Sequence, residues 1–176
     1  IYYNHPWGSA ESQGGSIGFA NYVDMSHSPR YPFGHGLSYA KFSYRDLQIA
    51  NREVDPRDDI VCSFCLENAS DRVGDEVVQI YVSDRFASRT RPVMELAAFR
   101  RISLQPHEEK KVICHISPSQ LAFLDKDMKW KIEKGDIDLL IGASSKDIRL
   151  KDSIRITENA WMDGRDRNFY GKVEVR

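Results

Sequence analysis

The chain has 176 residues, 41% of them hydrophobic, and a formal net charge of -1. This length suits one well-buried domain with extensions, and the interleaved basic and acidic residues lack the concentrated basic surface that nucleic acids require. No apolar run approaches the roughly 20 residues that span a bilayer, so no membrane partner is expected. The three cysteines, an odd number, favour free thiols and a cytoplasmic location over a disulfide framework.

The first part of the chain has the composition of a loop. Residues 7–22, WGSAESQGGSIGFANY, are rich in Gly and Ser and show no sustained apolar period. They are followed at 31–39 by YPFGHGLSY, which places one proline, two glycines, one histidine and three aromatic rings in nine residues. Pro32 restricts its own φ, while Gly34 and Gly36 permit dihedrals that other residues avoid. The motif therefore predicts a turn of fixed shape.

Beyond this turn, short segments alternate apolar and polar residues between turn signals, the pattern of strands with one buried face. The strongest predicted strands, each with its expected core residues, are 60–68 (Ile60, Cys62, Phe64, Leu66), 76–84 (Val78, Ile80, Val82), 109–117 (Val112, Cys114, Ile116), 127–135 (Met128, Trp130, Ile132) and 136–144 (Ile137, Leu139, Ile141). Weaker predictions cover 42–49, 99–104 and 148–156. One helix is predicted, over 117–125, with Ser117 as its cap and Pro118 at its first position.

Seven or eight short strands about ten residues apart, joined by polar turns, are typical of an antiparallel β-sandwich. We therefore expect an all-β fold of the immunoglobulin or fibronectin type III kind, with an irregular N-terminal extension. A doubly wound α/β sheet would need crossover helices for which the chain has no room. The segment after Thr157 is charged but carries Trp161, Phe169 and Tyr170, so we expect this C-terminal tail to be docked rather than free.

The acidic residues do not predict a catalytic centre. A retaining glycosidase needs two carboxyl groups about 5 Å apart. Asp71, Asp75, Glu76, Asp125 and Asp127 all fall in predicted turns or at outward positions, where solvated surface charges are the usual case. No two of them stand out as a pair.

The histidines and cysteines likewise predict no metal site. Cys62 and Cys65 should point to opposite faces of one strand, and the histidines lack the spacing of two zinc ligands. Cys114 and His115 are neighbours on a strand and should point apart, which argues against a nucleophilic pair. We expect the imidazole of His35 to donate a hydrogen bond to a nearby carbonyl group.

The motif YPFGHGLSYAKFSY at 31–44 closely resembles the junction, in glycoside hydrolase family 3 enzymes, between the α/β-sandwich domain and the C-terminal fibronectin type III-like domain. The resemblance continues in order and at similar spacing through 75–84, 90–112, 121–125 and 132–150. It departs from the family at Ala97, Ala98 and His107, the last standing where a turn glycine is usual.

The resemblance implies three parts: residues 1–36 as the loop-rich end of the preceding domain and linker, 37–157 as the fibronectin type III-like domain, and 158–176 as the C-terminal tail. Members of the family hydrolyse β-linked glucosides or xylosides, using a nucleophile and an acid/base from other domains.

The chain is therefore expected to hold no catalytic residue, cofactor or metal. We expect it to brace the catalytic domains of a β-glycosidase, which lie in the same polypeptide or in a partner chain. The first choice for that enzyme is a β-glucosidase and the second choice is a β-xylosidase. Homo-oligomer contacts are compatible with this role. Candidate interdomain or pocket-rim residues are Asn4, His5, Trp7, Tyr31, Phe33, His35, Arg89 and Arg91.

A second class of function is a stand-alone carbohydrate-binding or protein-interaction β-sandwich. Trp7, in a loop, is a candidate for surface contact, whereas the alternation around Trp130 favours core packing over a binding platform. This class predicts binding to an insoluble or oligomeric glycan that is lost when an exposed aromatic ring such as Trp7 is replaced.

Overall fold

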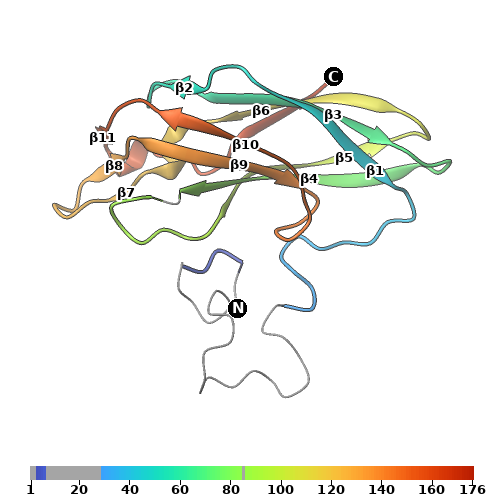
Figure 1. The fold of residues 1–176 in the computed structure, drawn as a ribbon, viewed down its shortest axis with the longest axis horizontal. Helices are drawn as coiled ribbons and strands as arrows, with labels where there is room; N and C mark the ends of the chain where they lie inside the picture. The colour runs from blue at the N-terminus through green and yellow to red at the C-terminus, as the bar shows by residue number, and fades with distance from the viewer. Residues whose placement is uncertain (1–2, 7–28, 85) are drawn as a thin grey trace, which may run out of the picture.

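A computed structural model describes residues 3–6, 29–84 and 86–176 as a sandwich of two sheets (Figure 1). The first sheet has the order β1 (Phe42–Ile49), β3 (Ile60–Asn68), β6 (Glu109–Ile116) and β12 (Lys172–Val175). The second has the order β2 (Glu53–Val54), β10 (Ile148–Ile156), β9 (Gly135–Gly142), β4 (Gly74–Asp84) and β5 (Glu95–Leu104). The prediction of an all-β sandwich is confirmed.

The inward faces of the main strands form the core between the two sheets. The core faces predicted for β3, β4, β6 and β9 are all buried, with each of their predicted core side chains at most 3% exposed. Strict alternation identified them because every second residue of a strand points to the same side of its sheet. Cys62 and Cys114 are free thiols that face each other across β3 and β6, and their contact together with burial raises the pKa of Cys114.

A small third sheet closes one end of the sandwich. It has the order β11 (Ala160–Met162), β8 (Trp130–Ile132) and β7 (Phe123–Leu124), and lies at the left end of Figure 1. Met128 was expected in the core of this region, and that prediction is wrong. The residue is 73% exposed with a φ of 58°, because it lies in the turn between β7 and β8 rather than on a strand.

The helix predicted over 117–125 is also wrong, although its start is right. Ser117 caps and Pro118 begins a single 3₁₀ turn, η1 (Pro118–Leu121), which ends as Ala122 adopts an extended conformation. The following residues alternate, with Phe123 buried and Leu124 exposed, and pair with β8 as a strand. Within the described residues, no helical element has the length and apolarity needed to cross a bilayer.

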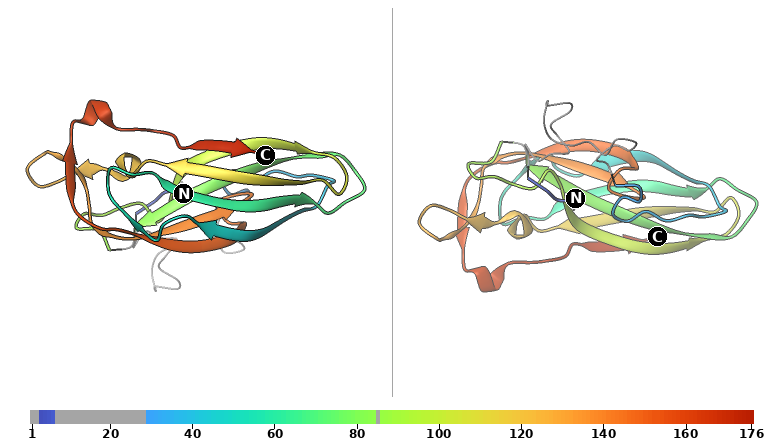
Figure 2. Two further views of the ribbon diagram at one scale, coloured as in Figure 1. Left: turned by 90° about the horizontal axis from the view of Figure 1, so that it is seen from above. Right: turned by 90° about the horizontal axis from the view of Figure 1, so that it is seen from below.

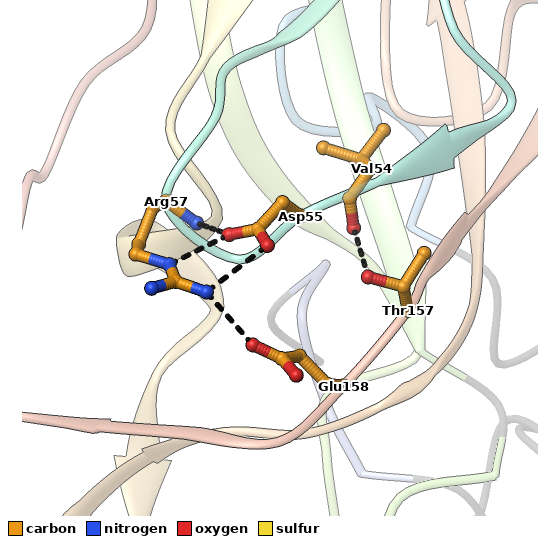
Figure 3. Close-up of polar contacts among 5 residues, drawn as sticks. All are labelled: Val54, Asp55, Arg57, Thr157 and Glu158. Atoms are coloured by element: carbon orange, nitrogen blue, oxygen red, sulfur yellow. Dashed lines mark hydrogen bonds and ion pairs between the residues drawn. The ribbon is translucent and has the colours of Figure 1, made fainter.

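One pair of strands departs from the expected antiparallel arrangement. β2 runs parallel to β10, with Val54 opposite Ile156, and both backbone and hydroxyl groups of Thr157 donate to the Val54 carbonyl, at 3.0 and 3.3 Å (Figure 3). The guanidinium of Arg57 joins this corner by bonding to Asp55 and, at 2.9 Å, to Glu158. These ion pairs are exposed to solvent, which screens them, so they add little to stability.

The segment after Thr157 is docked, as expected, and the structure shows that it docks on the sandwich through strand pairing. β11 pairs with β8 and β12 pairs with β6, and the left view of Figure 2 shows β12 in red beside its sheet. The Gly171 amide donates to Ala97 O at 2.8 Å and Arg100 donates to Val173 O at 2.7 Å, so β12 also contacts β5 of the other sheet. The predicted anchors Trp161, Phe169 and Tyr170 are instead exposed. Main-chain hydrogen bonds hold this segment.

Two departures from the family pattern have local explanations. His107 has a φ of 58°, a left-handed conformation in which a glycine is favoured, and its imidazole is 2.8 Å from Asp71 Oδ1. Ala97 and Ala98 are buried at a register shift between β4 and β5, where larger side chains would need extra space.

Candidate interdomain face

Strand β4 is buried on both faces from Val78 to Ser83. Val78, Ile80 and Val82 point into the core, while the outward residues Gln79, Tyr81 and Ser83 are also buried. An outward face of a sandwich normally contacts water, so a further layer must cover it. That layer is formed by residues 3–6 and 33–34, and Figure 1 shows the N-terminal segment beside the sheet that contains β4.

Aromatic rings and main-chain bonds attach residues 3–6 to this face. The ring of Tyr3 stacks on Phe33 with centroids 4.2 Å apart and meets the edge of Tyr81 at 5.9 Å. Its hydroxyl accepts a hydrogen bond from the Leu96 amide at 3.1 Å. The Val93 amide donates to His5 O at 2.9 Å, extending the attachment along the loop that precedes β5.

Gln79 fastens the linker to the sheet. Its amide nitrogen donates to Gly34 O at 3.2 Å and to Ala143 O at 2.6 Å, and its Oε1 accepts from the Tyr81 hydroxyl at 2.6 Å. A second tether runs from the Ser145 amide to Phe33 O, at 2.9 Å. A buried amide with all these partners fixes one geometry, because each partner left unpaired would cost free energy.

The fixed shape predicted for YPFGHGLSY is explained mainly by Gly34. It has a φ of +78°, and a Cβ at this position would lie 2.0 Å from Gln79 Oε1. The backbone amide of His35 closes the turn by donating to Pro32 O at 2.9 Å. Gly36 has neither a positive φ nor any atom within 4 Å of a built Cβ, so the special dihedral predicted for it is wrong.

A row of apolar side chains beside this turn is open to solvent. Leu37 and Tyr39 are 93% and 92% exposed, and nearby side chains add to the surface. Together these six side chains form what we call the linker row: Tyr31, Phe33, Leu37, Tyr39, Val73 and Val77. Four of these residues line a groove of about 1160 Å³ between the linker and the ends of β4 and β5: Leu37, Tyr39, Val73 and Val77.

The polar wall of the groove holds perturbed groups but no free acid/base pair. Burial raises the pKa of Glu76 in this wall. Tyr44 does not line the groove, but burial raises its pKa much more strongly, and its hydroxyl has no hydrogen-bond partner among the described residues. Asp147 is bonded through both oxygens to Arg149, and this hydrogen bonding lowers its pKa. Asp147 is therefore held in an ion pair with Arg149.

The candidate residues from the sequence lie in different settings. Asn4 and His5 are half-buried in the docked segment, and Arg89 is exposed in the loop before β5, while Trp7 lies outside the described residues. Arg91 is buried, bonded to Glu95 at 2.8 Å, and stacked 5.2 Å from the centroid of Phe123, so it holds the sandwich together.

Two further candidates belong to the linker itself. Tyr31 and His35 are exposed, and their rings meet at 5.5 Å in a tilted contact. The hydrogen bond expected of His35 is made by its backbone, and no hydrogen bond of its imidazole is found within the described residues. Phe33 is the candidate that joins the linker row to Tyr3.

Sequence reasoning missed Tyr3, Gln79 and Tyr81, which make most of the attachment. The segment VVQIYV at 77–82 contained a usable signal, because apolar or aromatic residues on both faces of a strand indicate burial on both sides. Within residues 3–6, 29–84 and 86–176, no three His, Cys, Asp or Glu side chains gather as they would around a metal ion.

Comparison with known proteins identifies this architecture. A family model described as "Fibronectin type III-like domain" matches residues 76–145. The chain is 38% identical over 141 residues to thermostable β-glucosidase B of Acetivibrio thermocellus, covering 80% of this chain and 19% of that protein. It is 37% identical over 134 residues to a β-xylosidase of Formosa agariphila, covering 76% of this chain and 18% of that protein.

Solved structures give the same result. A crystal structure of β-glucosidase from Listeria innocua in complex with isofagomine superposes with a TM-score of 0.78 at 30% identity, covering 89% of this chain and 22% of that one. The chain thus spans about a fifth of the length of the proteins it matches. The chain belongs to the fibronectin type III-like domains of glycoside hydrolase family 3 enzymes.

Proposed function

We propose that the chain is the C-terminal structural domain of a retaining β-glycosidase. A β-glucosidase is the first choice for that enzyme, and a β-xylosidase is the second. It braces the catalytic domains of that enzyme and does not itself cleave a glycosidic bond. The relatives named above are β-glucosidases and β-xylosidases of which the chain matches about a fifth, which supports a domain within a larger enzyme.

The linker row is the observation that carries this proposal. Soluble monomers rarely expose a large contiguous apolar patch, and such a patch marks an interaction surface. Leu37 and Tyr39 are almost fully exposed, yet they lie only a few residues after Gly34, whose carbonyl accepts a hydrogen bond from the Gln79 side chain. A rigidly held segment that presents apolar side chains is suited to meet a neighbouring domain without a large loss of conformational entropy.

The first test is catalytic. The purified chain is expected to give no turnover of nitrophenyl β-glucoside or nitrophenyl β-xyloside. Turnover that disappears in Glu76→Gln or Asp147→Asn would contradict the proposal, because Glu76 and Asp147 are two of the three acidic residues that line the groove.

The second test concerns the linker row in the parent enzyme. Leu37→Asp places a charge in the proposed interface and is expected to lower the thermal midpoint of the whole enzyme and shorten its active half-life. Tyr170→Asp is the matched control, since this ring is 77% exposed and lies outside the linker row. Equal effects of the two substitutions would count against an interdomain role.

A second copy of the chain is the competing occupant of the linker row. Sedimentation of the chain alone separates the two cases: a dimer that Leu37→Asp dissociates would assign the row to self-association. A monomer of the 20.2 kDa chain is the expected result.

A further inference from the structure

The tip of the sandwich carries a second surface site, distant from the linker row. A shallow pocket of about 500 Å³ lies at the sheet formed by β7, β8 and β11, and its lining residues are Met128, Lys129, Trp130, Trp161, Met162, Asp163 and Gly164. None of them lines the groove beside the linker. Figure 1 shows this tip at the left, whereas the linker enters β1 at the right. We call these seven residues the tip site.

Trp161 displays its indole ring in a fixed orientation. The side chain is 58% exposed, and its Nε1–H donates to Asp125 Oδ2 at 3.0 Å. The other oxygen of Asp125 accepts from the backbone amides of Asp127, at 2.9 Å, and Lys129, at 3.0 Å. These hydrogen bonds lower the pKa of Asp125, so the carboxylate stays charged and keeps the indole in place. A ring held in this way loses little entropy when a ligand stacks on it.

The floor of the tip site is equally constrained. Trp130 is half-buried, and the guanidinium of Arg167 lies over its ring at 4.9 Å from the centroid. The backbone of Gly164 approaches the indole of Trp130 so closely that a Cβ on Gly164 would lie 2.2 Å from the indole nitrogen. The pocket is therefore formed before any ligand arrives, as small-molecule sites usually are.

The chemistry of the tip site selects the class of ligand. Its rim carries one cation, Lys129, and one anion, Asp163, which balance each other and favour neither a phosphate nor a metal cation. Trp161 and the two methionines supply apolar contact, while the charged rim supplies a hydrogen-bond donor and an acceptor. A neutral ring with apolar faces and hydroxyl groups at its edge meets all these demands, and the volume lies in the range of small-ligand pockets, about 300–1,000 Å³.

We propose that the tip site binds a pyranose ring of a β-linked glycan, with the ring stacked on Trp161. The sugar ring follows from the site alone, whereas the β-linkage rests on the proposed function. Such a site holds polymeric substrate at the surface of the enzyme, away from the interface with the catalytic domains.

The experiment is native affinity electrophoresis of the 176-residue chain in gels containing a soluble β-1,3-glucan, β-1,4-glucan or xylan, with the α-glucan dextran as the comparison. At least one β-glycan is expected to retard the chain. Trp161→Ala is expected to raise the dissociation constant about tenfold, the effect of losing roughly 1.4 kcal/mol of stacking. Trp161→Phe keeps an aromatic ring and is expected to retain most of the binding.

Tyr39→Ala is the control, because this ring is even more exposed than that of Trp161, 92% against 58%, but lies in the linker row. It should leave retardation unchanged, and thermal midpoints measured for every variant identify any that is misfolded. Retardation by no glycan, or equal retardation of the wild type and Trp161→Ala, would overturn the tip site. Retardation by dextran alone would overturn the β-linkage. The turnover assay is independent of these results, so the proposed function can stand or fail separately.

Discussion

Replacing Gly34 by alanine tests how the linker is attached. Alanine must adopt the φ of +78°, and its Cβ would lie 2.0 Å from Gln79 Oε1, so the amide of Gln79 must move. The backbone term costs about 1–2 kcal/mol. Displacing Gln79 breaks its three hydrogen bonds, which contribute about 1 kcal/mol each. The expected loss is therefore about 4–5 kcal/mol, and it can be no larger than the free energy that docks the linker on the sheet.

A double-mutant cycle separates the two terms. Gln79→Ala alone loses the three hydrogen bonds but opens the space that the new methyl group needs. The double variant Gly34→Ala/Gln79→Ala is then expected to cost about 3 kcal/mol less than the sum of the single variants, because the three hydrogen bonds are lost only once. Gly36→Ala is the control in the same motif, and because its Cβ meets nothing within 4 Å it should change stability by less than about 0.5 kcal/mol.

Urea unfolding followed by far-UV circular dichroism gives the global free energies. Hydrogen exchange gives a local measure, because the amides of Ser145 and Leu96 are bonded to Phe33 O and the Tyr3 hydroxyl. Both amides should exchange faster in Gly34→Ala. Additive free energies in the cycle, or equal effects of Gly34→Ala and Gly36→Ala, would refute the steric explanation.

Two further predictions concern the core and the groove. Phe64→Ala should cost about 3–5 kcal/mol in the same urea assay, because the ring is 1% exposed, while Phe169→Ala, at 67% exposure, should cost less than about 0.5 kcal/mol. The raised pKa of Glu76 means that the folded chain binds its proton more readily than the unfolded chain, so stability falls as pH rises above about 4.3. Glu76→Gln should therefore be more stable than wild type at pH 7 and equal to it below about pH 4. Asp75→Asn should behave oppositely, because hydrogen bonds from Ser103 and Arg101 lower the pKa of Asp75 and the stability they supply is lost as pH falls below about 3.9. Unfolding curves from pH 3 to 8 that show one sign for both variants would contradict these assignments.

The strands could be predicted from the sequence wherever one face alone meets the core. In β3 and β6 the buried residues alternate with less buried ones along most of the strand, so period two is a sufficient signal. The same period misplaced Met128, because alternation carries no information about where a turn interrupts a strand. The short strands β11 and β12 could not be recognised, since three or four residues give too few repeats of the pattern.

The attachment of the linker was only partly predictable. The glycines and proline indicated a fixed turn, and Gly34 fulfils that prediction. Its partner Gln79 lies 45 residues further along the chain, and the contact of Tyr3 with Leu96 spans 93 residues. Contacts of this kind depend on how the sheets are assembled, which a local pattern in one sequence does not contain.

The bonds from Gln79 and Ser145 to consecutive linker carbonyls have a consequence for the exchange of modules between related enzymes. Two anchors on neighbouring residues, Phe33 and Gly34, define a direction as well as a position, so whatever precedes the turn inherits its orientation from this sandwich. A chimaera should therefore be joined upstream of Tyr31, carrying turn and sandwich together as one cassette. A junction placed between residues 35 and 41 would pair a foreign turn with a glutamine that it was not shaped to meet.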